Sequence, residues 1–339
     1  MQYIRSPNKY KKVNKWITDF RKFIEKEITN MKMRFEQFTE EVVNKIREFL
    51  PESFANASVE LQTVTKNNDL KLTGLTIRCA DNNICPTIYL EQFYDKYQSG
   101  EDMGKILSNI ADVRVRNEVK NGFDVEQITD FERVKDVIVP RLIGKEWNSS
   151  LLEQRPHKIV ADLAVTYHIM LKQDIDGTAS APITYALMQG WGVDVDTLHE
   201  LALRNMPVLL PSTFQSMSSV LSEMLYKDMD DEDAERLLAD MVPQDDLMFV
   251  LSNKQKVNGA AALLDKDIMQ KIVEKFGEDF YILPSSVHEC IIVSADADMD
   301  TSQLTAMIQE VNAGQVAPEE RLSDHPYRYT VEDGLLSII

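Results

Sequence analysis

The segment Lys158-Ile-Val-Ala-Asp-Leu-Ala-Val-Thr-Tyr-His-Ile-Met-Leu171 decides the predicted fold. Alternate residues of a strand share a face, and both faces of this segment are largely apolar. It therefore predicts one long strand, buried on both sides, in the middle of a sheet. His168 lies within this pattern and is interpreted as a core residue whose polar atoms are satisfied. The expected core comprises Ile159, Leu163, Val165, Ile169 and Leu171, together with Tyr281, Leu283, Ile291 and Val293.

Short strands and helices surround this segment. Asn and Asp tolerate left-handed backbone, so Lys66-Asn-Asn-Asp69 predicts a turn between strands at 58–64 and 70–77. Farther along, Pro284-Ser285-Ser286 predicts the turn of a hairpin. Because the strands pair locally and helices separate them, we expect an α+β fold with mixed, mostly antiparallel sheets and packed helices. Further strands are predicted at 86–90, 137–143, 248–251, 280–283 and 287–293, and helices at 102–112, 125–135, 184–190, 197–205, 214–226, 231–241, 265–276 and 300–312.

The residues between Pro7 and Pro51 contain no other proline and no glycine, and their apolar residues recur at steps of three or four. This spacing predicts a long amphipathic helix, which unbroken would run roughly 60 Å at about 1.5 Å per residue. The alternation of three- and four-residue steps is interrupted before Ile28 to Met31, where a kink or break of the helix is expected. A stripe this long favours a partner helix, from another copy or another part of the chain. The residues predicted to make this interaction are Val13, Ile17, Phe20, Ile24, Phe35 and Phe38.

Length and charge suggest how the chain is divided. The 339 residues suit two domains or one large one. We expect a basic helical extension at 1–32, an N-terminal α+β region at 33–135 and a C-terminal α+β region at 136–339, although the last two could form one domain. The net charge is −18, but residues 1–34 carry ten Lys or Arg against three Asp or Glu, so this part is +7 and the remainder −25.

The acidic remainder disfavours nucleic acid as a partner, because proteins bind nucleic acid largely by neutralising phosphates. The basic N-terminal helix could still contact nucleic acid, although a solvated helix face is the preferred interpretation. The cations available for such a contact are Lys9, Lys11, Lys12, Lys15, Arg21 and Lys22.

Composition and motifs favour no metal and no cofactor. Cys79, Cys85 and Cys290 are unevenly spaced, which is typical of buried free thiols rather than of a disulfide framework or a zinc site. The acidic runs that begin at Asp228 and Asp296 lack the glycine and glutamate of a calcium-binding loop. No phosphate-binding glycine loop or dinucleotide fingerprint is present. With no apolar run near the roughly 20 residues needed to span a bilayer, and no signal peptide, a cytoplasmic location is expected and no membrane association.

One short stretch combines a histidine with serines and a carboxylate. His288 follows Ser285 and Ser286 at the predicted hairpin tip and is followed by Glu289. A nucleophile and a base could be built from such residues, but neighbours on a strand point to opposite faces, so turn chemistry is the preferred interpretation. The segment around His325 is aromatic and polar and could lie over this hairpin. The candidate binding residues are Ser285, Ser286, His288, His325, Tyr327 and Arg328.

Several segments carry a family resemblance. They include Phe35-Glu-Gln-Phe-Thr-Glu-Glu-Val42, Leu72-Thr-Gly-Leu-Thr-Ile77, Phe280-Tyr-Ile-Leu-Pro-Ser-Ser-Val-His-Glu289 and Leu322-Ser-Asp-His-Pro-Tyr-Arg-Tyr329. In these the chain resembles a domain family of unknown function from anaerobic gut bacteria. The resemblance covers most of the chain from about residue 33 onward, so residues 1–32 lie outside it. It implies family membership, but no activity and no catalytic residue.

The sequence therefore favours a non-enzymatic cytoplasmic protein that works through protein contacts, as an adaptor or regulator. Two alternatives remain open: a hydrolase that uses the hairpin near His288, and a nucleic-acid-associated protein that uses the basic N-terminal helix. One observation separates the first alternative from the adaptor. A deep pocket shared by His288 and His325 would favour an enzyme.

Overall fold

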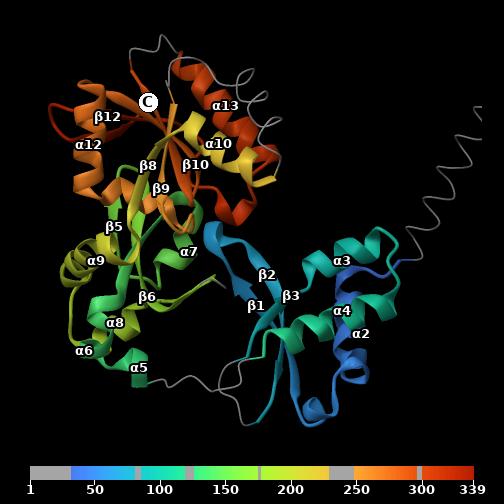
Figure 1. The fold of residues 1–339 in the computed structure, drawn as a ribbon. Helices are drawn as coiled ribbons and strands as arrows, with labels where there is room; N and C mark the ends of the chain where they lie inside the picture. The colour runs from blue at the N-terminus through green and yellow to red at the C-terminus, as the bar shows by residue number, and fades with distance from the viewer. Residues whose placement is uncertain (1–31, 81–84, 119–125, 175–176, 229–247, 296–299) are drawn as a thin grey trace, which may run out of the picture. The chain divides into compact units, whose positions relative to one another are not determined.

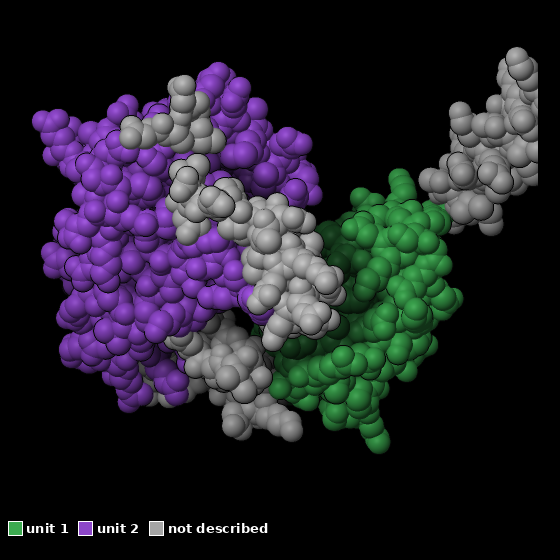
Figure 2. All heavy atoms as spheres, turned by 45° about the horizontal axis from the view of Figure 1, so that its top comes forward, with its two compact units in different colours: residues 1–64, 71–123 green, residues 65–70, 124–339 purple. Residues whose placement is uncertain are grey.

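The protein divides into two compact units. The computed structural model describes residues 32–80, 85–118, 126–174, 177–228, 248–295 and 300–339. By contacts between residues, unit 1 comprises residues 1–64 and 71–123, and unit 2 comprises residues 65–70 and 124–339 (Figure 2). The sequence places the boundary at 135–136, whereas the contacts group residues 124–135 with unit 2. Among the described residues, no helix has the length and apolar character needed to cross a membrane.

Unit 1 is a small three-stranded sheet with helices packed on it, and the strands lie in the order β1-β2-β3. Its core contains Phe38, Val42 and Ile46, which are fully buried against residues of β2, α3 and α4. The strands and the turn 66–69 predicted here are confirmed. The elements are α2 (Phe35–Lys45), η1 (Ile46–Phe49), η2 (Glu52–Phe54), β1 (Ser58–Thr65), β2 (Lys71–Arg78), β3 (Thr87–Tyr89), α3 (Glu91–Gln98) and α4 (Met103–Arg116).

Within the described residues, the long helix predicted between Pro7 and Pro51 starts only after a break at Arg34, close to the kink or break expected near Ile28 to Met31. Arg34 has extended backbone (φ −72°, ψ 163°), so α2 begins only at Phe35, and the chain tightens into a 3₁₀ turn at Ile46. The rings of Phe35 and Phe38 pack on Tyr94, with centroids 5.1 and 5.3 Å away. This end of the apolar stripe is therefore satisfied inside unit 1. Val13, Ile17, Phe20 and Ile24 lie outside the described residues.

Unit 2 contains two antiparallel sheets. The first consists of β4, β6, β5 and β7, and the second has the order β13-β12-β10-β11-β9-β8 (Figure 1). The fold is α+β, as the sequence predicts. The strands are β4 (Ile138–Gly144), β5 (His157–Val160), β6 (Leu163–Asp174), β7 (Gly177–Pro182), β8 (Ser212–Ser216), β9 (Met248–Asn253), β10 (Phe280–Ser286), β11 (Glu289–Ser294), β12 (Tyr327–Thr330) and β13 (Leu335–Ile338).

Helices cover these sheets. α9 packs on β4 of the first sheet, while α12 contacts β8 and α13 contacts β10 of the second. The α-helices of unit 2 are α5 (Glu126–Thr129), α6 (Phe131–Val134), α7 (Ser149–Leu152), α8 (Tyr185–Trp191), α9 (Val195–Leu209), α10 (Met217–Asp228), α12 (Lys266–Phe276) and α13 (Thr301–Gly314). The 3₁₀ turns are η3 (Asn67–Asp69), η4 (Lys135–Val137), η5 (Glu146–Asn148), η6 (Gly259–Leu264) and η7 (Pro318–Glu320).

The long strand predicted at 158–171 is two strands. Ala161 has a left-handed backbone (φ 54°) and turns the chain, so β5 pairs back on the first residues of β6. Farther along, β7 pairs with β6, while β4 runs beside it from Leu163 to Ile169. The turn leaves Ile159 45% exposed, and Leu171, near the end of the sheet, is 40% exposed. These two core predictions are wrong, whereas Leu163, Val165 and Ile169 are buried as predicted.

Strands β10 and β11 of the second sheet are buried on both faces. Phe280 and Ile282 of β10 join the large core that also contains β6 and α12. Leu283 and Val293 face the other way, against α13, with Tyr281 and Ile291 partly buried beside them. The β10–β11 turn lies at residues 287–288 rather than at 284–286, and an irregularity in the pairing separates Pro284 from Ser286.

Three further local predictions differ from the structure. The helix predicted at 214–226 begins as strand β8, and α10 starts only at Met217. α8 ends at the left-handed Gly192 rather than at Gly190. Strands β7, β12 and β13 were not predicted. The helix predicted at 231–241 lies outside the described residues.

The corrected core makes a testable contrast between two isoleucines of neighbouring strands. Ile169 is 1% exposed, so Ile169→Ala should lower the free energy of unfolding by roughly 2 to 5 kcal/mol through lost burial and a cavity. Ile159→Ala, at an exposed site, should change it by about 0.5 kcal/mol or less. Urea unfolding followed by circular dichroism measures both. Equal losses in the two variants would contradict this placement of the core.

Candidate anion-binding site

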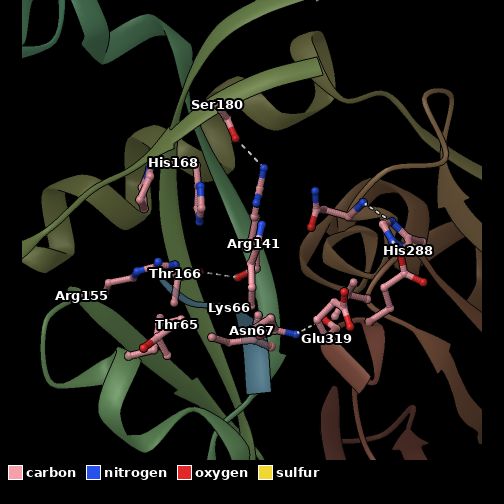
Figure 3. A pocket seen from close by; sticks show the side chains of 16 residues that line it. Thr65, Lys66, Asn67, Arg141, Arg155, Thr166, His168, Ser180, His288 and Glu319 are labelled. Atoms are coloured by element: carbon pink, nitrogen blue, oxygen red, sulfur yellow. Dashed lines mark hydrogen bonds and ion pairs between the residues drawn. The ribbon is translucent and has the colours of Figure 1, made fainter. Parts of the chain in front are cut away.

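A cavity of about 440 Å³ lies in unit 2, and it is lined mainly by polar and charged side chains. One wall belongs to the first sheet and carries Arg141, Thr166, His168 and Ser180. The other wall belongs to the β10–β11 turn and η7, with His288 and Glu319 (Figure 3). The remaining lining residues are Thr65, Lys66, Asn67, Ile143, Leu151, Arg155, Pro182, Asn258, Val287 and Glu320.

The first wall follows from the alternation of β6. Val165 and Tyr167 point into the large core, so Thr166 and His168 point to the opposite face of the strand. Arg141 of β4 is directly paired with Thr166 in the sheet. On the other edge of β6, Ser180 accepts a short hydrogen bond from Nη2 of Arg141. On this face of β6, Thr166 and His168 form a polar stretch between the buried apolar residues Ala164 and Met170.

Two guanidinium groups dominate this wall electrostatically. Arg141 and Arg155 make no ion pair with any carboxylate in the described part of the chain. Burial, and then the nearby positive charge of Arg155, lower the pKa of Arg141 to about 10. Burial also lowers the pKa of Arg155. The wall therefore carries positive charge that the surrounding described protein does not neutralise.

His168 is buried in the same wall but is not satisfied, which corrects its interpretation from sequence. Only 4% of the residue is exposed, and its Nδ1 has no hydrogen-bond partner. Burial, followed by the charges of Arg141 and Arg155, holds the pKa of His168 well below its usual value. The imidazole is therefore neutral, and one of its buried polar atoms lacks a partner, which ordinarily costs about 1 to 3 kcal/mol.

The opposite wall is acidic and rigidly held. The backbone N–H of Asn258 donates to Nδ1 of His288 (3.0 Å), and Nε2 of the same ring lies 3.4 Å from Oε1 of Glu320. Ser252 Oγ donates to the carbonyl of His288 (2.8 Å). A Cβ on Gly259 would lie 2.4 Å from that same carbonyl, so only glycine allows this close approach.

The turn between β1 and β2 completes the cavity and belongs to unit 2. Asn68 adopts left-handed backbone (φ 61°), and its Nδ2 donates to the carbonyls of Pro318 and Arg321 (2.7 and 2.8 Å). Asn67 Nδ2 donates to the carbonyl of Glu319 (2.7 Å). Asp69 accepts hydrogen bonds from the first backbone N–H groups of α7. These bonds fix the position of Lys66 and Asn67 in the cavity lining.

The residues predicted from sequence near His288 do not form a nucleophile–base pair. Ser286 Oγ accepts from the backbone N–H of His288 (3.1 Å), and Ser285 Oγ donates to Glu289 (3.5 Å). Neither hydroxyl is bonded to the imidazole of His288. Of the six candidate binding residues, only His288 lines the 440 Å³ cavity.

His325, Tyr327 and Arg328 lie elsewhere. His325 lines a separate cavity of about 150 Å³, where its Nε2 lies 2.9 Å from Oδ2 of Asp162. Nε2 of His325 makes no hydrogen bond with the described residues, whereas Tyr327 donates one to Oδ1 of Asp162 (2.7 Å). Arg328, on β12, forms an ion pair with Asp279, in which Nη2 and Oδ2 are 2.7 Å apart. His288 and His325 therefore do not share a pocket.

The described residues contain no group of three or more His, Cys, Asp or Glu side chains placed to hold a metal ion. The site is accordingly a polar cavity between two antiparallel sheets of an α+β protein, with unneutralised cations on one wall. The model of a family of unknown function (DUF5688) matches residues 35–331, and the chain belongs to this family. No curated protein and no solved structure matches the chain.

Sequence reasoning did not find Arg141 and Arg155, although one signal was present. Arg141 interrupts the otherwise apolar strand Ile138-Val-Pro-Arg-Leu-Ile-Gly144, and Thr166 and His168 fall at alternate positions of a neighbouring apolar strand. Polar residues at alternate positions of two strands can share one face. The register that makes them neighbours is absent from the sequence of either strand.

The buried His168 predicts how stability depends on pH. Its folded pKa lies well below 6.5, so as pH falls below about 6.5 the unfolded chain binds a proton that the folded chain does not. Stability should therefore decrease from pH 7.5 to pH 5, with His168 contributing up to about 1.4 kcal/mol per pH unit. Urea unfolding at several pH values should give a shallower slope for His168→Gln. His199, whose pKa burial also lowers, remains in both proteins. Identical slopes would contradict a neutral buried His168.

Proposed function

We propose that unit 2 binds a small molecule through an anionic group, a phosphate or a carboxylate, held by Arg141 and Arg155. The observation that carries the proposal is the pair of guanidinium groups on one cavity wall without a carboxylate partner among the described residues. Both arginines are partly buried, and charges that lose hydration in this way are normally paired or coordinate an ion. A bound anion would supply the missing partner.

The chemistry of the wall suits such a ligand. A guanidinium group donates two parallel hydrogen bonds to a carboxylate or a phosphate, and these bonds are stronger than neutral ones. Thr166 and Ser180 place hydroxyl groups beside Arg141, and Lys66 adds a further cation to the lining. The cavity volume lies within the usual range of small-molecule sites, about 300 to 1,000 Å³. The polar lining favours a hydrophilic ligand over an apolar one.

Titration calorimetry with sodium phosphate and with sodium acetate tests this proposal, against sodium chloride at equal ionic strength. We expect saturable binding of at least one anion beyond the effect of chloride. Arg155→Gln should weaken it at least tenfold, about 1.4 kcal/mol, because a charge-assisted hydrogen bond is lost. The matched control is Arg204→Gln, since Arg204 is on the surface and paired with Asp136 at 2.8 Å.

Retained affinity in Arg155→Gln, or an equal loss in Arg204→Gln, would contradict the assignment. The melting temperature of each variant separates a loss of binding from a loss of folding. A variant that melts like the wild type but no longer binds phosphate or acetate supports a direct role of Arg155.

We also propose that the protein is a cytoplasmic adaptor or regulator that uses residues 13–28 for protein contacts. The first support is the stripe of apolar residues in the sequence. The second is that the later residues of this stripe, Phe38, Val42 and Ile46, are fully buried within unit 1. These residues are therefore not available to a partner, and a partner would contact the earlier part of the stripe, residues 13–28. Cys79, Cys85 and Cys290 are free thiols, which is consistent with a reducing compartment.

Light scattering on the full chain and on a chain that begins at Met33 tests the adaptor proposal. We expect the truncation to convert an oligomer into a monomer, or to abolish binding to a helical partner, while leaving the stability of unit 1 intact. If both chains are monomeric, equally stable and equally unable to bind a partner, the front segment is dispensable and this proposal fails.

A further inference from the structure

We infer that the ligand of the 440 Å³ cavity is zwitterionic: it carries a cationic amine in addition to the anionic group, and the amine is held by Glu319 and Glu320. This inference rests on the proposed anion site and adds the substrate class. It comes from the second wall, whose charge is opposite to that of the first (Figure 3).

The acidic wall has acceptors that the described protein does not use. Among the described residues, the carboxylate of Glu320 pairs only with the ring of His288, at 3.4 Å, and the carboxylate of Glu319 makes no hydrogen bond or ion pair. Nearby, Oδ1 of Asn67 is buried and has no partner, although its Nδ2 donates to the backbone of Glu319. An ammonium group has three donors and no acceptor, so it matches a site made of two carboxylates and an amide oxygen.

The two walls do not neutralise each other. No ion pair joins Arg141 or Arg155 to Glu319 or Glu320, although all four residues line one cavity. The backbone explains this separation. Arg141 lies in the middle of β4, within the sheet. On the other side, the carbonyl of Glu320 accepts from Val287 N–H (2.8 Å), which ties η7 to the β10–β11 turn. Neither wall can move without breaking several hydrogen bonds.

A fixed separation of charge selects a ligand with two poles. A simple anion would be attracted by the arginines but repelled by the glutamates, and a simple amine would meet the reverse situation. A molecule with an acid at one end and an amine at the other gains from both walls. Amino acids and amine-bearing phosphate esters belong to this class, and molecules of this size fit a cavity of about 440 Å³.

The test compares matched pairs of probes by titration calorimetry at pH 7 and constant ionic strength. One pair is phosphoethanolamine and ethyl phosphate, and the other is 4-aminobutyrate and butyrate. In at least one pair, we expect the zwitterion to bind the wild type tenfold or more tightly than its partner without the amine. In the double variant Glu319→Gln, Glu320→Gln this advantage should fall to about twofold, while the probe without the amine binds as well or better. Glu332→Gln, at an exposed site, is the control and should keep the full advantage.

The outcomes separate the two proposals. If ethyl phosphate or butyrate binds the wild type as tightly as the zwitterion does, the acidic wall does not recognise an amine. The present inference is then overturned, while the anion site stands. If none of the four probes binds, the anion site fails and this inference fails with it. A melting temperature of the double variant close to that of the wild type shows that the change in preference comes from the cavity and not from unfolding.

Discussion

The double pairing of β6 is the constraint on which the rest of unit 2 depends. β4 runs along one edge of this strand, and β5 and β7 share the other, so its register is fixed by three partners. A shift by one residue would exchange its two faces, moving Val165 and Tyr167 out of the core and Thr166 and His168 into it. The apolar face thereby determines where the polar face lies. The cavity wall is a consequence of how the core is packed.

The electrostatics of the cavity follow from this rigidity. Arg141 and Arg155 are close enough that the charge of one lowers the pKa of the other, and both lower the pKa of His168. In a flexible surface such groups would separate and regain water. Here Arg141 is held in the middle of β4, which pairs with β6 along its length, and the backbone of η7 is held by the side-chain amides of Asn67 and Asn68. Opposite charges therefore face one cavity without forming an ion pair, which is the arrangement of a preorganised site.

The fold class, most strands and the turn at 66–69 could be predicted from sequence, because alternation, Asn and Asp in turns, and caps such as Asp300 are local signals. The errors have two causes: an unexpected backbone conformation, and contacts between residues far apart in the sequence. Ala161 has a left-handed backbone although its residue type gives no sign of it, so one predicted strand is two. Burial of Phe38 depends on Tyr94, 56 residues later, which no helical pattern reveals. The site itself depends on cross-strand register, as between Arg141 and Thr166, and register is a property of pairs of strands.

The hydrogen bonds around the cavity also bear on whether its residues form a hydrolytic nucleophile–base pair. A serine or threonine nucleophile needs a histidine whose free nitrogen accepts its proton. Nδ1 of His288 already accepts from the backbone of Asn258, and its Nε2 faces Glu320, so neither nitrogen is placed to receive a proton from a hydroxyl. His168 has an Nδ1 that is unpartnered among the described residues, and the hydroxyl oxygen of Ser180 accepts a hydrogen bond from Arg141. Cys290 is fully buried, which raises the pKa of its thiol. Among the described groups around the cavity, no serine or threonine hydroxyl is hydrogen-bonded to a histidine ring nitrogen.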